Sequence, residues 1–228
     1  MESLFNNLHV LTCHIPPLLA ITGYLLYPTN LRINPSLLYF LSVIHNGFLV
    51  VFSTWTFLSL SQILYNDGIV FQSGYYFQNI HFDKIIFWFY LSKYYEFFDT
   101  FLLYLNGKTP IFLQKYHHIG AVICWHLCYI YKVDGIWIAT ELNSFVHTVM
   151  YSYYLGCLLK INQLRFIKQY ITSLQLIQLI PQPLCLYLYK NETIFNYNIL
   201  YIFTLYSIYL VYLFSLFYYN TYYKTKSY

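Results

Sequence analysis

Four groups of polar and ionisable side chains lie inside long apolar stretches of this sequence. They are Lys93, Glu96, Asp99 and Thr100; Gln114, His117 and His118; Asn143 and His147; and Gln175 and Gln178. A charged side chain at the centre of a bilayer is costly unless it is paired or faces water, so such residues mark a functional interior. A neutral imidazole can act there as a nucleophile. The pattern predicts chemistry inside a membrane.

Helical geometry aligns the first group, because residues three, four and seven positions apart share a face. Lys93, Glu96 and Thr100 form one stripe, and Asp99 lies at its edge. We expect the lysine and the glutamate, three residues apart, to neutralise each other. The alternative interpretation is a structural ion pair that holds two helices together.

The second group places Gln114, His117 and His118 on one helix face, with Cys124 two turns further along in nearly the direction of His117. A single histidine is more often a hydrogen-bonded core residue. A histidine pair preceded by a glutamine at this spacing favours a catalytic or metal-binding role.

The next two apolar stretches carry further polar residues. One face of the first holds Asn143, His147, Tyr151 and Tyr154. Helix packing explains the two tyrosines as well as a role in lining a ligand site does. Packing does not explain the histidine and the asparagine. In the second stretch, Gln175 and Gln178 lie three residues apart, a spacing that hydrogen bonding between helices would also explain.

The composition indicates the elements that position these groups. Hydrophobic residues make up 59% of the chain, charged residues only 9%, and the mean hydropathy is +0.48, whereas a soluble domain carries roughly 25% charged residues. Stretches of about 20 apolar residues predict an all-α fold with seven transmembrane helices at residues 11–27, 37–64, 84–105, 111–131, 136–159, 167–189 and 197–219. We therefore expect residues 1–228 to form a single integral-membrane domain.

Lysine and arginine residues in the loops predict the orientation, because cytosolic loops are enriched in them. One set of alternating ends holds Arg32, Lys108, Lys160, Arg165, Lys168, Lys224 and Lys226, and the other holds Lys84, Lys132 and Lys190. The first set is expected to face the cytosol. The N-terminus is then lumenal and the C-terminus cytosolic, and the sequon at Asn191 lies in a lumenal loop too short for us to expect its use.

Together the four groups resemble the elongation of very-long-chain fatty acids family, the membrane 3-ketoacyl-CoA synthases. The likeness rests on Lys93-Tyr-Tyr-Glu96-Phe-Phe-Asp99-Thr100, Gln114-Lys-Tyr-His117-His118, His147-Thr-Val-Met150-Tyr151-Ser-Tyr153-Tyr154 and Thr172-Ser-Leu-Gln175-Leu-Ile-Gln178. All four motifs occur in the order that the family shows.

The resemblance implies seven helices, six of which enclose an acyl tunnel closed at the lumenal side. It implies condensation of malonyl-CoA with a long-chain acyl-CoA in the endoplasmic reticulum membrane, which releases CoA and carbon dioxide and leaves a 3-oxoacyl-CoA. No bound cofactor, metal or nucleic acid is implied. The partners would be the ketoacyl-CoA reductase, the dehydratase and the enoyl reductase of the cycle, and a homodimer is compatible. The C-terminal Lys224-Thr-Lys226-Ser-Tyr228 fits a dilysine-type retrieval signal.

Carried over residue by residue, the resemblance makes His117 the nucleophile that accepts the acyl chain. His147 would polarise the thioester carbonyl, and Asn143 would fix its tautomer or add a donor. The lysine, glutamate and aspartate of the first group would form a charged frame around the histidines. The cytosolic candidates for binding the CoA phosphates are Lys108, Lys115, Arg165 and Lys168, although the positive-inside rule explains cations there equally well.

Two features depart from the family pattern, and a third set of residues concerns the length of the substrate. Gln114 stands where many members carry a first histidine, and this version resembles elongases that accept polyunsaturated chains in lower eukaryotes. The segment 105–108 is less basic than is usual. Acyl length would depend on side chains that close the tunnel, for which the candidates are Tyr187, Tyr189, Phe203 and Tyr206.

Three alternatives remain open at this point. A di-iron desaturase or hydroxylase also uses histidine boxes, but it needs about eight histidine ligands, and the whole chain has 8 histidines, several of them outside any site. A seven-helix lipid receptor or transporter would explain the spans but not the motif spacing. Within the enzyme class, Cys124 would replace His117 as acyl carrier, although an apolar setting disfavours the thiolate.

Overall fold

The computed structural model describes residues 13–27, 31–181, 184–185, 188–189 and 193–224. Its helices are α2 (Ile15–Leu26), α3 (Pro35–Asp67), η1 (Tyr76–Gln78), α4 (Ile80–Tyr95), α5 (Phe97–Leu105), α6 (Phe112–Ile130), α7 (Ile136–Leu158), η2 (Asn162–Ile167), α8 (Lys168–Ile177) and α10 (Ile194–Tyr222). Within these residues the only extended pairing is an isolated bridge between Arg32 and Asn106. The predicted all-α fold is confirmed for the described part of the chain.

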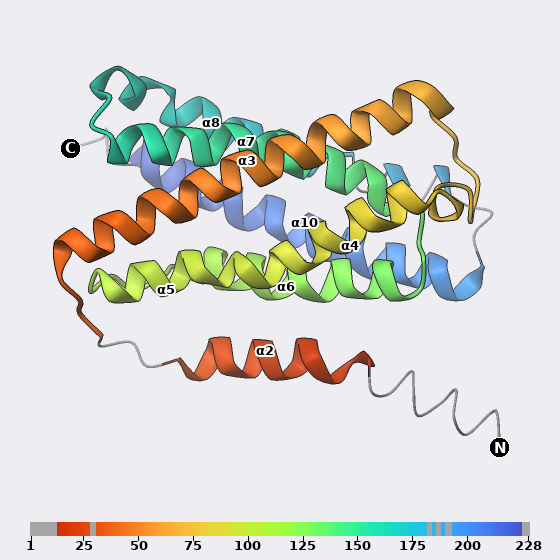
Figure 1. The fold of residues 1–228 in the computed structure, drawn as a ribbon, viewed down its shortest axis with the longest axis horizontal. Coiled ribbons are helices and arrows are strands. Elements are labelled where there is room, and N and C mark those ends of the chain that lie inside the picture. The colour runs from red at the N-terminus through yellow and green to blue at the C-terminus, as the bar shows by residue number, and fades with distance from the viewer. Residues whose placement is uncertain (1–12, 28–30, 182–183, 186–187, 190–192, 225–228) are drawn as a thin grey trace.

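The long helices lie side by side along the long axis of the molecule (Figure 1). Helix α3 packs along α7, while α6 contacts both α4 and α10. Helix α2 lies along one edge of the bundle and contacts α6. Its outward face is exposed, with Leu18, Leu19 and Leu26 at 63%, 67% and 76%. This apolar exposure is what a lipid-facing helix requires.

Local sequence signals determine where several helices begin and end. Asn34 caps α3 by accepting a hydrogen bond from the Ser36 amide at 2.8 Å, and Pro35 occupies the first turn. Both choices are favoured at helix N-termini. Gly68 follows α3 with a φ of 74°, a conformation that glycine adopts without strain. Asn79 caps α4 through the amides of the next turn.

Two of the predicted spans are not single helices. The stretch 84–105 is divided into α4 and α5, with Glu96 at the junction. The prediction of one helix over residues 167–189 is also wrong, because α8 ends at Ile177 and Pro181 follows in a turn. Proline has no backbone N–H with which to continue the helical hydrogen bonding. Two helical segments, Pro35–Asp67 and Asn196–Tyr222, are long and apolar enough to cross a bilayer by themselves. The count of seven spans stays a prediction.

Aromatic side chains close the bundle at the end where α3 turns into α4. The Tyr76 hydroxyl donates to the Gly68 carbonyl at 2.8 Å and accepts from the Val70 amide at 3.0 Å. Trp137 donates to the Tyr189 hydroxyl at 2.9 Å, and Tyr189 is buried. Burial of polar groups with their partners makes this end a packed closure. Tyr189 therefore lies at the far end of the bundle from the α5–α6 turn.

Candidate active site

A buried lysine connects two of the predicted groups. The Lys93 ammonium donates to Glu96 Oε1 at 2.8 Å and to Asn143 Oδ1 at 2.7 Å. It lies 4.0 Å from the centre of the Phe89 ring and 4.9 Å from that of Trp125, so ring faces cover the rest of the charge. The expected pairing of Lys93 with Glu96 is confirmed.

The break between α4 and α5 positions this ion pair. Glu96 has φ −63° and ψ −15°, and its amide donates to the Ser92 carbonyl at 2.9 Å. The side chains of Lys93 and Glu96 are 1% and 2% exposed. A buried ion pair is tolerated only when further hydrogen bonds satisfy its members. Within the described residues, Glu96 Oε2 lacks a hydrogen-bond partner, so one acceptor of the site remains available.

The same network determines the proton position on His147. Because Asn143 Oδ1 accepts from Lys93, the amide nitrogen of Asn143 faces His147 Nε2, at 3.2 Å, and donates to it. His147 Nδ1 then carries the proton and faces Glu96 Oε1 at 3.4 Å. The contacts agree with the expectation that Asn143 fixes the tautomer of His147.

His117 on α6 is held from the opposite side by Tyr206 on α10. The Tyr206 hydroxyl donates to the backbone carbonyl of His117 at 2.9 Å, and it lies 3.1 Å from His117 Nδ1. A tyrosine has one hydroxyl proton. With that proton directed to the carbonyl, His117 Nδ1 must be the donor, and Nε2 keeps its lone pair.

A glycine makes this approach of α10 to α6 possible. A Cβ atom at Gly120 would lie 2.0 Å from the Tyr206 ring, far inside contact distance. The sequence suggests Tyr206 only as a tunnel-closing residue, and its bond to His117 could not be read from the motifs. The available signal was the small residue three positions after the histidine, which allows a ring to approach the helix backbone.

The acidic and imidazole groups of the site converge. One donor atom from each of Glu96, His117 and His147 lies within 4.8 Å of the others. This spacing would also suit a metal ion, but Glu96 Oε1 already accepts from the Lys93 ammonium, and a second cation there would be repelled. The donor set fits proton transfer and charge stabilisation better than a metal, and the predicted lack of a metal stays a prediction.

The remaining residues of the histidine motif face α2 and α5. Gln114 donates to Thr100 Oγ1 at 3.1 Å, and Thr100 also bonds the Tyr24 hydroxyl at 2.9 Å. Buried His118 lies beside the rings of Tyr24 and Phe97. Gln114 therefore acts through hydrogen bonds, as its chemistry predicts, and contacts Thr100 rather than His117.

Half-buried Asp99 contacts two buried residues, one of which the motifs missed. His45 Nε2, on α3, lies 2.9 Å from Asp99 Oδ1, and the Tyr151 hydroxyl donates to Asp99 Oδ2 at 2.7 Å. His45 is 1% exposed. The signal for His45 was its position, with Asn46, inside an apolar stretch. His45, Asp99 and Tyr151 thus join α3, α5 and α7.

Of the predicted pair Gln175 and Gln178, Gln178 contacts the histidine network. Gln178 Oε1 accepts from the Asn143 amide at 3.5 Å. Gln175 lies instead 3.0 Å from the Met150 sulfur, and Tyr154 packs against the Tyr151 ring. Gln178 is therefore the member of this pair that the fold brings to the histidine network.

Three of the four candidate CoA-binding cations have described side chains. Lys108 and Lys168 are exposed, and the Lys115 ammonium lies 5.8 Å from the centre of the Tyr104 ring. The side chain of Arg165 falls outside the described residues, as do Tyr187, Lys226 and the sequon at Asn191. Their roles stay predictions.

A small cavity adjoins His117, with a volume of about 20 Å³. Asn143, Gln178, Phe203 and Tyr206 line it. That volume suits about one water molecule, so an acyl chain enters only when the lining side chains move. Phe203 also packs against Trp125, with ring centres 5.3 Å apart. The extended acyl tunnel stays a prediction.

Comparison with known proteins places the chain in a family. The model of the ELO family, described as the GNS1/SUR4 family, matches residues 10–228. The chain belongs to the ELO family. Together with the two long apolar helices, membership identifies it as a helical membrane protein. The resemblance drawn from the four motifs is confirmed.

Several curated relatives in this family are named fatty acid elongases. The chain is 44% identical over 99 residues to fatty acid elongase sre1 of Dictyostelium discoideum, covering 42% of this chain and 36% of the relative. It is 40% identical over 101 residues to very long chain fatty acid elongase 4 of Trypanosoma cruzi, at 43% and 35% coverage. With very long chain fatty acid elongase 4 of Homo sapiens it shares 33% over 146 residues, at 60% and 46% coverage. The matched part thus spans a third to a half of these relatives.

Proposed function

We propose that this ELO-family protein is the condensing enzyme of fatty acid elongation, a 3-oxoacyl-CoA synthase of the endoplasmic reticulum membrane. The observation that carries the proposal is the pair of oriented imidazoles. His117 presents an unprotonated Nε2, because Tyr206 engages its Nδ1, and His147 lies beside it in a defined tautomer. The names of the relatives support the same reaction class.

In the proposed first half-reaction, His117 Nε2 attacks the thioester carbonyl of the acyl-CoA. The carbon–sulfur bond breaks, CoA leaves with a proton, and the acyl chain remains on the imidazole. Glu96 Oε1, 3.4 Å from His147 Nδ1, would keep that ring in its Nδ1–H tautomer beside His117. The Asn143 amide beside that ring would donate to the developing oxyanion.

In the second half-reaction, malonyl-CoA loses carbon dioxide and the resulting enolate carbon attacks the acyl-imidazole. The carbon–nitrogen bond breaks and His117 regains its proton. The sum is acyl-CoA, malonyl-CoA and one proton converted into 3-oxoacyl-CoA, CoA and carbon dioxide. Because the proposed reaction is not a reduction, reduction and dehydration of the product would fall to partner enzymes, and the exposed Lys108 and Lys168 would meet the CoA phosphates at the cytosolic end.

The test is incorporation of radiolabelled malonyl-CoA by microsomes that contain the protein, with a panel of acyl-CoA chain lengths and unsaturation. We expect products two carbons longer with wild type and none with His117→Ala. A signal that survives in His117→Ala but disappears in Cys124→Ala would transfer the acyl carrier to the thiol. Acyl-CoA binding by folded protein without incorporation of any chain would favour the receptor or transporter alternative.

A further inference from the structure

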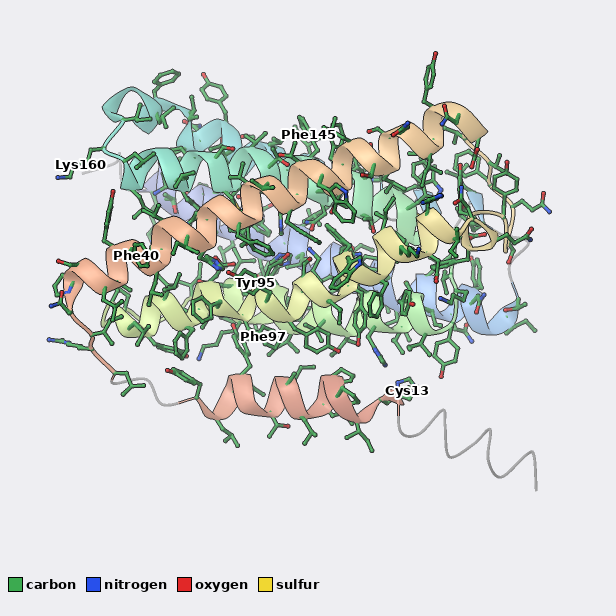
Figure 2. The ribbon with its side chains drawn as sticks, in the orientation of Figure 1. Cys13, Phe40, Tyr95, Phe97, Phe145 and Lys160 are labelled. Carbon is green, nitrogen blue, oxygen red and sulfur yellow. The ribbon has the colours of Figure 1, made fainter. Side chains whose placement is uncertain are left out.

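A second cluster of ionisable side chains lies outside the proposed active site, at the end of the bundle where α2 begins and α6 ends. Cys13 and His14 immediately precede α2, and His126 lies in the last turns of α6. Figure 2 labels Cys13 at this end, with Lys160 at the opposite end of the molecule. The described contacts of the catalytic histidines do not include these residues. The cluster therefore needs an explanation of its own.

The two imidazoles of this cluster point nitrogen to nitrogen. His14 Nδ1 and His126 Nε2 are 2.8 Å apart, and the rings meet edge to face with centres 5.0 Å apart. One donor atom from each of Cys13, His14 and His126 lies within 4.8 Å of the others. One sulfur and two imidazole nitrogens are a donor set that zinc and similar cations favour.

The outer nitrogens of both rings are already held as metal-ligating histidines require. His14 Nε2 lies 3.1 Å from the Tyr131 hydroxyl, and His126 Nδ1 lies 3.0 Å from the Tyr90 hydroxyl. Tyr90 in turn is 2.5 Å from the Tyr94 hydroxyl, to which it can donate. When a metal ion is bound, each tyrosine oxygen can accept an N–H from its histidine, and both inner lone pairs then face the ion.

We propose that Cys13, His14 and His126 form a metal site for a zinc-type divalent cation. In tetrahedral coordination two imidazole nitrogens lie about 3.3 Å apart, so binding requires the inner nitrogens to separate by roughly half an ångström. Binding moves the proton shared between the two inner nitrogens to an outer nitrogen, releases the thiol proton of Cys13 to solvent, and leaves a fourth coordination position open. His126 is buried while Cys13 and His14 are partly exposed, which gives the ion an entry path.

The consequence of this site is structural. Helix α2 lies at the edge of the bundle, and its other described attachments are the Tyr24 hydroxyl bond to Thr100 at 2.9 Å and ring contacts of Tyr24 and Tyr27. A cation that bridges His14 and His126 would fix the opposite end of α2 to α6. Because Thr100 also accepts from Gln114, the position of α2 is linked to the histidine motif.

The experiment uses the full chain purified in detergent with an affinity tag that contains no histidine, titrated with Co²⁺ as a spectroscopic substitute for Zn²⁺. We expect a sulfur-to-cobalt charge-transfer absorption that Zn²⁺ displaces and that is absent in Cys13→Ser. His14→Gln and His126→Gln should weaken binding at least about tenfold. Matched controls are Cys157→Ser and His81→Gln, at exposed positions, and both should bind as wild type does.

A second measurement, thermal unfolding with and without the ion, distinguishes loss of metal binding from loss of folding. Saturating Zn²⁺ should raise the thermal unfolding temperature of wild type relative to chelator, and Cys13→Ser should unfold as metal-free wild type does, with or without the ion. Absence of the charge-transfer absorption in wild type would overturn the proposal. An absorption unchanged by Cys13→Ser, or binding abolished by His117→Gln, would also overturn it by assigning the ion to another site.

Discussion

In the proposed mechanism Tyr206 determines which nitrogen of His117 attacks, so Tyr206→Phe tests that mechanism most directly. The substitution keeps the buried ring, which is 8% exposed, and removes only the hydroxyl that bonds the His117 carbonyl at 2.9 Å and Nδ1 at 3.1 Å. Without that oxygen, the proton of His117 has no partner at Nδ1. Part of the population then carries its proton on Nε2, where attack is blocked.

The size of the effect follows from the hydrogen bonds that this hydroxyl makes to His117. One hydrogen bond contributes about 0.5–1.5 kcal/mol, and about 1.4 kcal/mol corresponds to a tenfold change in rate. We therefore expect kcat for elongation to fall by roughly twofold to twelvefold in Tyr206→Phe. The KM for both substrates should stay unchanged, because the hydroxyl contacts His117 rather than the acyl-CoA in the proposed complex.

The assay is steady-state incorporation of malonyl units with purified enzyme, together with mass spectrometry of acylated His117 after brief exposure to acyl-CoA. Tyr209→Phe is the matched control, because Tyr209 is 42% exposed and packs on the Tyr116 ring. Gly120→Ala supplies an independent perturbation, since its Cβ would lie 2.0 Å from the Tyr206 ring and would displace a hydroxyl that is still present. A wild-type kcat and acylation rate in Tyr206→Phe would show that Tyr206 does not orient His117.

Three further predictions concern the rest of the site. Lys93→Met leaves the buried Glu96 carboxylate unpaired and should destabilise the protein by about 3–5 kcal/mol, seen as a lower thermal unfolding temperature that Glu96→Gln in the same chain partly restores. Cys124→Ala should retain full elongation activity in the microsomal assay, and loss of activity would argue for a thiol carrier. His45→Leu removes one partner of Asp99 and should cost about 1–3 kcal/mol, measured by thermal unfolding against Tyr154→Phe as control.

The helical content and most helix positions could be predicted because apolar composition and span length are local properties of a membrane chain. The residues 37–64 and 136–159, for example, correspond to α3 and α7 within a few positions. The break at Glu96 could not be predicted in the same way. No proline or glycine marks this position in the sequence, and the Glu96 carboxylate at the junction contacts Lys93 on α4 and His147 on α7.

The sequence by itself determined the family and the set of groups available for catalysis. Motif spacing places Gln114, His117 and His118 on one face, because helical geometry depends only on separation along the chain. The pairing of Lys93 with Glu96 followed from the same local rule.

Only the tertiary structure decided which groups meet and in which protonation state. Tyr206 lies 89 residues from His117 in the chain, and no periodicity connects them. Their contact exists because Gly120 allows α10 to approach α6. Likewise Asn143, Lys93 and His147 define one another's hydrogen bonds across two helices. Hydrogen-bond direction depends on all partners at once, and those partners are set by packing rather than by sequence distance.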